Sequence, residues 1–309
     1  MKASTGAGLA ALALVYNAFT WGVSWWPFRQ LHASGLHPLW ATVLIYSLSL
    51  LAITLWRPAA WRQLLRTPTL WWLILASGTT NAAFNWAVTL GDVVRVVLLF
   101  YLMPLWAVLL ARLLLGEPIR GSALARVGLA LAGAALILAT GKGTGVGVGL
   151  DTGTVAATGT GLGLPIPQSL AEWLGVLGGL TFALNNVLLR REAAQPPESR
   201  ALAMFLGGVI VAGGLALLLH GTVPLPPAPA WPWVLGILAM GLWFFSSNLA
   251  LQYGAARLPA NVTAVVMVSE VLFASVSAIV LGAGSLSWPL VVGATLIISA
   301  SLLSAREGR

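Results

Sequence analysis

Ten long apolar stretches constrain this chain more than any other feature of its sequence. They lie at residues 8–28, 38–56, 69–90, 93–115, 121–140, 170–190, 201–219, 231–253, 260–281 and 287–304. Each has close to the roughly 20 residues that an α-helix needs to cross a bilayer. Polar or Gly/Pro clusters separate them, as at Gly116-Glu117-Pro118. We therefore predict an all-α integral membrane protein with ten transmembrane helices.

The composition excludes the main soluble classes. Hydrophobic residues make up 59% of the 309 positions and charged residues 8%, whereas soluble domains carry about 25% charged residues. A soluble fold of this size could not bury so much apolar side chain. This excludes an ordinary cytosolic enzyme, a nucleic-acid-binding protein and a disordered chain. The absence of cysteine excludes disulfides and thiolate metal sites, and we predict neither a metal nor a cofactor.

The basic residues set the orientation. If the N-terminus is cytoplasmic, thirteen Lys and Arg residues lie on the cytoplasmic side, and only Arg29, Arg95 and Lys142 lie on the other. Cytoplasmic loops of membrane proteins carry such an excess. Topology therefore accounts for the net charge of +8. We predict an inner (plasma) membrane protein with both termini in the cytoplasm.

The sequence also contains an internal repeat. Shifting it by 163 residues aligns small or amide residues in and directly after one helix of each half, namely Gly78 with Gly241, Asn85 with Asn248, Ala87 with Ala250 and Gly91 with Gly254. A three-residue insertion then aligns Gly116 with Gly282, and Pro104 with Glu270. Each half contains five predicted helices, and the odd number inverts the second half in the membrane. Inverted repeats are typical of secondary transporters, which bind substrate between the halves.

The repeat defines three parts of the chain. Residues 1–140 form the first five-helix repeat and residues 170–309 form the second. Residues 141–169, rich in Gly and Thr, form a linker on the outer, periplasmic side. Such a composition cannot bury a core and is typical of flexible segments.

Several stretches resemble a known family. Residues 104–117, from Pro-Leu-Trp-Ala-Val to Leu-Gly-Glu, resemble the end of the fourth helix of EamA-type members of the drug/metabolite transporter superfamily. AVTLG at 87–91 and ALQYG at 250–254 are similar to the ends of its third and eighth helices, and LTFALNNVLLRR at 180–191 to its sixth. The resemblance implies ten helices in two inverted five-helix repeats, and usually export of amino acids or other small metabolites. The long linker departs from the short connection typical of the family.

Glu270 is the clearest candidate for a functional residue. It lies ten residues into the predicted span that begins near Ala260, hence about 15 Å deep and close to the bilayer midplane. Charged groups at that depth are costly and are functional candidates by default. Two functional roles stay open, namely coupling to protons and a counter-charge for a substrate ammonium group. The alternative is a protonated Glu that only holds helices together.

Amide and aromatic residues within the spans extend this candidate site. The amide candidates are Asn17, Asn81, Asn85, Asn185 and Asn248. Amides in lipid must face a cavity or another helix, so they either hold polar groups of a substrate or join helices. The deep aromatic residues Trp21, Tyr101 and Trp243 either line an apolar pocket or face lipid. We expect Pro104 to kink its helix, as a gating element or as a structural feature alone.

The motifs favour transport over catalysis. The three histidines fall in predicted outer loops, and the chain has no H-E-x-x-H, G-x-S-x-G or phosphate-loop motif. We predict a secondary-active exporter of small metabolites, with hydrophobic or aromatic amino acids as the leading class, working by alternating access. Alternatives are an exporter of lipophilic amines or drugs, and a non-transporting intramembrane enzyme or scaffold. The partners are a small-molecule substrate, the lipid bilayer and, in one role of Glu270, protons. The sequence leaves monomer and dimer open.

Overall fold

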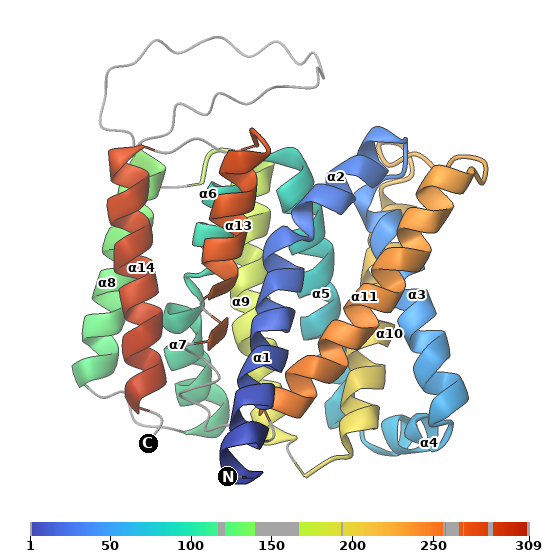
Figure 1. Cartoon of the computed structure of the whole chain (residues 1–309), viewed down its shortest axis with the longest axis horizontal. Helices are drawn as coiled ribbons and strands as arrows, with labels where there is room; N and C mark the ends of the chain where they lie inside the picture. The colour runs from blue at the N-terminus through green and yellow to red at the C-terminus, as the bar shows by residue number, and fades with distance from the viewer. Residues whose placement is uncertain are drawn as a thin grey trace.

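The computed structural model describes residues 2–116, 121–139, 167–192, 194–255, 257, 266–267, 269–283 and 287–307. Every regular element in these ranges is an α-helix, as the sequence predicts. The helices pack side by side in one bundle, with both ends of the chain at the same end of it (Figure 1). The predicted linker at 141–169 lies almost wholly outside the described residues.

The helices follow the apolar stretches closely. The first part of the chain forms α1 (Lys2–Val23), α2 (Trp25–Ala33), α3 (Pro38–Trp56), α4 (Ala59–Arg66), α5 (Thr69–Leu90), α6 (Val93–Phe100), α7 (Met103–Leu115) and α8 (Gly121–Ala139). The second part forms α9 (Leu170–Arg191), α10 (Pro197–Leu218), α11 (Trp231–Ala255), α13 (Ser269–Val280) and α14 (Trp288–Glu307). For α3 and α5 the predicted bounds and the observed bounds coincide.

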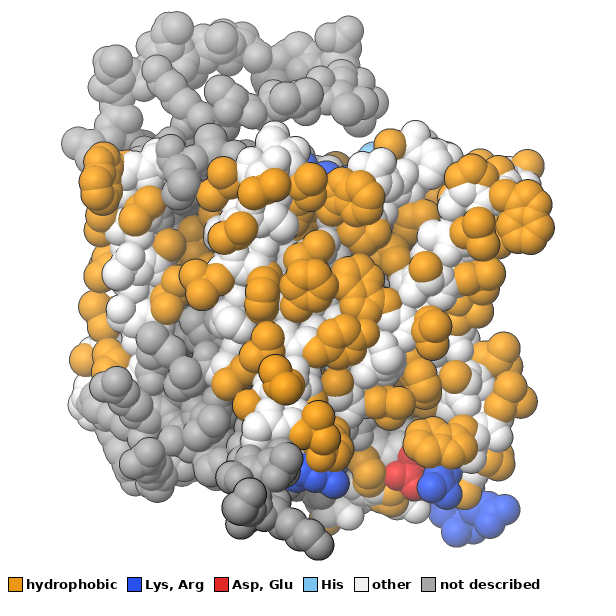
Figure 2. All heavy atoms as spheres, viewed as in Figure 1, with side chains coloured by type: hydrophobic (Ala, Val, Ile, Leu, Met, Phe, Trp, Pro, Cys, Tyr) orange, Lys and Arg blue, Asp and Glu red, His pale blue; other side chains and the backbone are white. Residues whose placement is uncertain are grey.

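Several helical segments can cross a membrane. Five of them are long and apolar enough within the described residues, namely Pro38–Trp56, Val93–Leu114, Leu170–Leu189, Pro197–Leu218 and Trp231–Gly254. Ser269–Val280 and Val291–Ala300 are shorter apolar helical stretches. Large hydrophobic side chains cover the outer face of the bundle (Figure 2). A surface so apolar is suited to lipid rather than to water. The chain is a multi-pass membrane protein.

Two predicted spans are divided in the structure, and a third is described only in part. The span predicted at 8–28 is divided at Ser24 into α1 and α2, and the span at 93–115 is divided at Tyr101 and Leu102 into α6 and α7. This second break lies in the turn that precedes Pro104, which is where a proline ring crowds the helix backbone; it agrees with the expected kink, and the gating role of Pro104 stays a prediction. Pro104 lies in the first turn of α7, where its missing N–H breaks no helical hydrogen bond. Of the span at 260–281, residues 260–265 and 268 lie outside the described residues.

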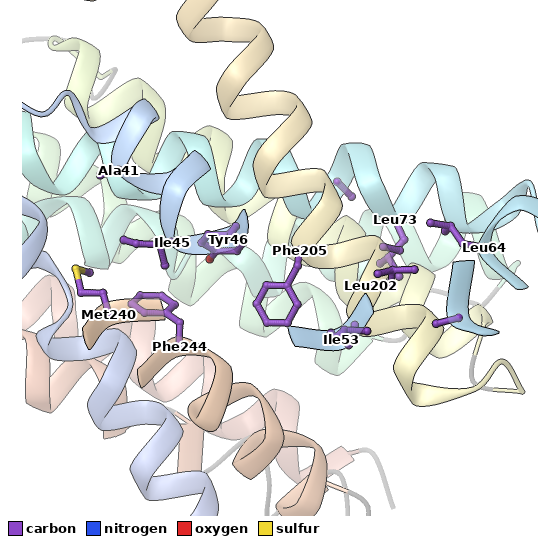
Figure 3. Packing of buried hydrophobic residues seen from close by; sticks show 14 of the residues in the cluster. Ala41, Ile45, Tyr46, Ile53, Leu64, Leu73, Leu202, Phe205, Met240 and Phe244 are labelled. Carbon is purple, nitrogen blue, oxygen red and sulfur yellow. The ribbon is translucent and has the colours of Figure 1, made fainter. Parts of the chain in front are cut away.

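Tight helix crossings bring the two parts of the chain together. α5 packs between α9 and α10, α3 packs on α10 and α11, and α1 packs on α11 and α13. At the α5–α10 crossing, a Cβ on Gly78 would lie 2.6 Å from the carbonyl carbon of Gly207, so both positions need glycine. Buried Tyr46, Phe205 and Phe244 meet between α3, α10 and α11 (Figure 3). These elements surround the candidate site.

Candidate functional site

A cavity of about 90 Å³ lies inside the bundle. Residues of α1, α3, α5, α9, α10, α11 and α13 line it, together with Phe100 at the end of α6. The space holds several water-sized groups. It is therefore large enough for a compact organic molecule and lies where both parts of the chain meet.

Glu270 is the one charged residue among the described residues that line this cavity. It stands in the first turn of α13 and is 8% exposed. The Tyr101 hydroxyl lies 3.1 Å from its Oε2 and 3.2 Å from the carbonyl oxygen of Met267, and it can donate its single proton to either. No Lys or Arg of the described residues pairs with Glu270. Its carboxyl group can therefore meet a charge that a ligand brings.

One face of α5 supplies a second polar wall. Ser77, Thr80, Asn81 and Phe84 all line the cavity. The Asn81 amide donates to the Ser77 carbonyl oxygen at 2.8 Å, and its Oδ1 accepts from the Tyr46 hydroxyl at 2.7 Å. The protein thus already engages both ends of this amide. Asn81 fixes the position of Tyr46 and has little capacity left for a ligand.

Unlike Asn81, the amides of Asn17 and Asn185 keep an oxygen that no protein group engages within the described residues. Asn17 Nδ2 donates to the carbonyl oxygen of Ser247 at 3.0 Å and to its Oγ at 2.7 Å. Because a carbonyl oxygen only accepts, these bonds fix the orientation of the amide. Asn17 Oδ1 and Asn185 Oδ1 are buried and accept no hydrogen bond within the described part of the chain. Both residues line the cavity, so it presents unused acceptors.

Aromatic rings form the rest of the wall. The Trp21 ring meets Phe244 edge-on at 4.9 Å between centroids, and Phe100 packs on Phe84 at 5.0 Å and on Phe182 at 5.2 Å. Such rings offer apolar contact and, through their faces, attraction for cations. The cavity therefore combines one carboxyl group and several amides with an aromatic enclosure.

The structure brings together six of the sequence candidates and leaves others apart. Glu270, Asn17, Trp21, Asn81, Asn185 and Asn248 line the cavity. Tyr101 does not line it but contacts Glu270. The Asn85 amide, fully buried, donates to Thr42 Oγ1 at 3.0 Å. Trp243 packs on Phe19 at 6.1 Å between ring centroids. The Pro104 side chain lies outside the described residues.

The sequence analysis missed several lining residues. Tyr46, Ser77, Thr80 and the five phenylalanines of the cavity were not candidates. The spacing of Ser77, Asn81 and Phe84 repeats every three to four residues, which is the signal of one helix face. For the phenylalanines no comparable signal exists, because aromatic residues in an apolar helix face lipid as readily as a cavity.

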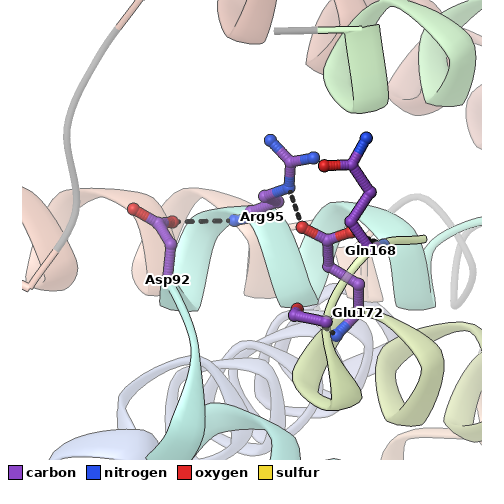
Figure 4. Close-up of polar contacts among 5 residues, drawn as sticks. Asp92, Arg95, Gln168 and Glu172 are labelled. Atoms are coloured by element: carbon purple, nitrogen blue, oxygen red, sulfur yellow. Dashed lines mark hydrogen bonds and ion pairs between the residues drawn. The ribbon is translucent and has the colours of Figure 1, made fainter. Parts of the chain in front are cut away.

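An ion pair closes the end of the bundle opposite the two termini. Arg95 Nε of α6 lies 2.6 Å from Glu172 Oε1 of α9 (Figure 4). Glu172 Oε2 also accepts from the Gln168 backbone N–H at 2.8 Å, and the Arg95 backbone N–H donates to Asp92 Oδ1 at 2.9 Å. These contacts hold α6 against α9 above the cavity.

Comparison with known proteins gives a family match for the first part of the chain. Residues 8–139 match the model of the EamA-like transporter family. This segment, less than half of the chain, is similar to that family. A solved crystal structure also resembles the EamA-like chain over 96% of each chain, with a TM-score of 0.55 and 19% sequence identity, and this likeness concerns the fold alone. No curated protein matches the sequence. The match supports the resemblance drawn from the sequence, and the family that it names is one of membrane transporters.

Proposed function

We propose that this EamA-like protein is a secondary-active exporter that binds its substrate in the cavity around Glu270 and works by alternating access. The observation that carries the proposal is the combination found there, one carboxyl group without a cationic partner in the described residues, amides with unused acceptors, and aromatic walls. Buried polar groups are stable only when they are satisfied. A ligand would satisfy these.

The proposed architecture is ten helices in two inverted repeats, residues 1–140 and 170–309, joined by the linker at 141–169. Helix packing supports it. α5 packs on α9, and its proposed counterpart α11 packs on α1. Gly91 ends α5 against Ala171, and its aligned partner Gly254 lies near the end of α11 against Leu14. Each contact thus has a matching contact in the other half.

The aligned glycines Gly116 and Gly282 further support the repeat. Both have φ of 69°, in the left-handed region that favours glycine. Gly116 directly follows α7, and Gly282 follows the end of α13 by two residues. Equivalent positions in two copies of one unit would be expected to terminate their helices in the same way.

Charge and the family resemblance support the proposed direction of transport and the proposed membrane. On the face seen in Figure 2, most Lys and Arg side chains gather at the end where both termini lie. This agrees with the positive-inside rule for cytoplasmic termini in an inner membrane. Export is the usual direction in the family that the sequence resembles. Glu270 would carry proton coupling or recognition of an ammonium group.

The proposed substrates are small metabolites that combine an amino group with an apolar body. Hydrophobic and aromatic amino acids, the leading class from the sequence, belong to this group, as do lipophilic amines. The aromatic rings around the cavity would contact the apolar body, and Glu270 with the amides would contact the amino group. A non-transporting scaffold would bind such compounds without moving them.

Flux through proteoliposomes tests the proposal. Vesicles with purified protein are loaded with labelled phenylalanine or phenethylamine, and release is followed with and without a pH gradient. We expect saturable release that Glu270→Gln reduces at least tenfold. Glu192→Gln is the matched control, because Glu192 is equally buried at 8% exposed but lies outside the cavity. Binding without release of any compound by correctly inserted protein would refute transport.

A further inference from the structure

The short helix α4 is held firmly against the end of the bundle. Its buried side chains, Ala60 and Leu64, pack among residues of α3, α5 and α10 (Figure 3). Gln63 Nε2 donates to Gln195 Oε1 at 2.8 Å and so ties α4 to the segment before α10. α4 lies at the same end of the bundle as the two termini (Figure 1). Its outer face therefore has a fixed position relative to the membrane-crossing helices.

This outer face is basic. Arg62 and Arg66 are four residues apart, which places them on one side of the helix, and Arg57 directly follows α3. All three residues are exposed. In the part of the chain that the structure describes, no carboxylate forms an ion pair with any of them, Glu198 in the first turn of the neighbouring α10 included. The first acidic residue of the sequence is Asp92. The surface is thus suited to an anion that another molecule brings.

An apolar groove begins two residues after Arg66. Pro68, Trp71, Trp72 and Leu75 line it. Their spacing of three to four residues places them along one side of the first turns of α5. The three side chains on α5 are more than half exposed, although they belong to a helix of the bundle. An exposed groove without polar lining on the surface of a membrane protein is suited to a lipid acyl chain.

Tryptophan residues mark the level of the membrane interface here. Trp56, the last residue of α3, is exposed, and the Arg57 guanidinium lies over its ring, 5.1 Å from the ring centroid. Trp61 of α4 donates from Nε1 to Thr54 Oγ1 at 2.9 Å. Tryptophan and arginine are typical of the layer in which lipid headgroups meet acyl chains. A phospholipid at this level has its phosphate near the arginines and its chains along α5.

We propose that α4 and the first turns of α5 form a binding site for an anionic phospholipid. Arg62 and Arg66 bind the phosphate, and one acyl chain lies in the groove of Trp71 and Trp72. The proposed occupant is an anionic lipid because a free anion would leave the groove empty, and a zwitterionic lipid would bring its own cation against the arginines. None of these residues lines the substrate cavity, so the inference is independent of the proposed transport.

Lipid titration followed by native mass spectrometry tests the proposal on the purified full-length protein in detergent. The probes are palmitoyl-oleoyl phosphatidylglycerol, which is anionic, and palmitoyl-oleoyl phosphatidylcholine, which has the same chains and no net charge. A basic residue near the membrane surface strengthens the binding of anionic lipid about fivefold. We therefore expect the Kd of phosphatidylglycerol to be at least about tenfold lower than that of phosphatidylcholine. Inorganic phosphate should not displace the bound phosphatidylglycerol.

Charge-matched variants locate the headgroup. The double variant Arg62→Gln with Arg66→Gln should weaken phosphatidylglycerol binding at least about tenfold and change phosphatidylcholine binding less than twofold. Arg191→Gln with Arg257→Gln is the control, because it removes the same charge from two other exposed arginines. This control should change both affinities less than twofold. The ratio of the two lipid affinities in one sample does not depend on how much of that sample is folded.

A second pair of variants locates the acyl chain. Trp71→Ala removes one wall of the groove and should weaken the binding of both lipids about threefold, so that their ratio stays the same. Trp173→Ala is the control, because Trp173 is also 55% exposed but lies on α9, outside the groove. It should change neither affinity by more than about a factor of 1.5.

Four results would overturn the proposal. Equal affinity for the two lipids would show that the arginines do not select an anion. Equal losses in the two double-arginine variants would show an effect of overall charge, and equal losses in Trp71→Ala and Trp173→Ala would show that the groove holds no chain. Displacement of phosphatidylglycerol by inorganic phosphate would show a site for a free anion instead of a lipid.

Discussion

The ion pair between Arg95 and Glu172 should hold α6 and α9 together, and its contribution can be measured. Arg95 Nε and Glu172 Oε1 are 2.6 Å apart, and the two side chains are only 13% and 11% exposed. Exposed ion pairs contribute about 0–1 kcal/mol, whereas removing one partner of a fully buried pair costs about 3–5 kcal/mol. This pair lies between those limits, so we expect Arg95→Met and Glu172→Gln each to cost about 2 kcal/mol of unfolding free energy.

The double variant should cost less than the two single variants together. Once Arg95 is replaced, Glu172 has already lost the attraction that its own substitution would remove. We therefore expect the double variant to cost about 2.5 kcal/mol, which gives a coupling energy of about 1.5 kcal/mol. Glu172→Gln keeps a side-chain oxygen that can still accept from the Gln168 N–H, so the cycle isolates the charge.

The unfolding free energies of the unchanged protein, the two single variants and the double variant are measured by equilibrium unfolding with SDS in mixed micelles, followed by circular dichroism. Arg191 and Glu192 are the control pair, because their atoms are 3.8 Å apart and the Arg191 side chain is 50% exposed. Their coupling should stay below about 0.5 kcal/mol. Additive effects at Arg95 and Glu172, or equal coupling in the two pairs, would refute the reasoning from burial.

Two further predictions concern α10 and the end of the bundle near α3. Gly208→Ala should destabilise the protein and weaken ligand binding, because the new Cβ would lie 2.5 Å from the Tyr46 ring, which lines the cavity. Gly214→Ala in the same helix, which has open space, should instead stabilise it by about 0.5–1 kcal/mol; equal melting shifts would contradict this. Burial, and secondarily His32, lowers the pKa of His37 from 6.5 to about 4. An unfolded chain therefore binds this proton more readily, and unfolding free energy should fall as pH drops from 6.5 towards 4; a titration of the His37 ring near 6.5 by NMR would contradict it.

Much of the fold follows from the sequence, because length and apolarity determine where a chain can cross lipid. α3 and α5 coincide with their predicted ranges, since Pro38 opens the first and Gly91 follows the second. The break at Ser24 was not predicted, and for the break at Tyr101 only a kink at Pro104 was expected. They fall inside continuous apolar stretches, where composition and hydropathy do not change.

The candidate site was predicted in part, for a physical reason. Polar residues in lipid must face the interior, which selects Glu270 and the asparagines. Which of these side chains points into the cavity depends on its direction around the helix axis, and this direction changes by about 100° from one residue to the next. On α5, Asn85 lies about 40° beyond Asn81 and faces α3 instead of the cavity. Trp243 lies about 100° from Phe244, which lines the cavity, and packs on Phe19.

The contact between Tyr101 and Met267 links the proposed repeat to the site. The register that aligns Pro104 with Glu270 also aligns Tyr101 with Met267, and the Tyr101 hydroxyl lies 3.2 Å from the Met267 carbonyl oxygen. Two equivalent positions of a two-fold repeat can touch only close to the axis that relates them. Glu270, 3.1 Å from the same hydroxyl, then lies beside that axis. Inverted-repeat transporters bind substrate at this interface, so the register of the repeat, taken alone, favours the same residue that the charge and burial of the cavity single out.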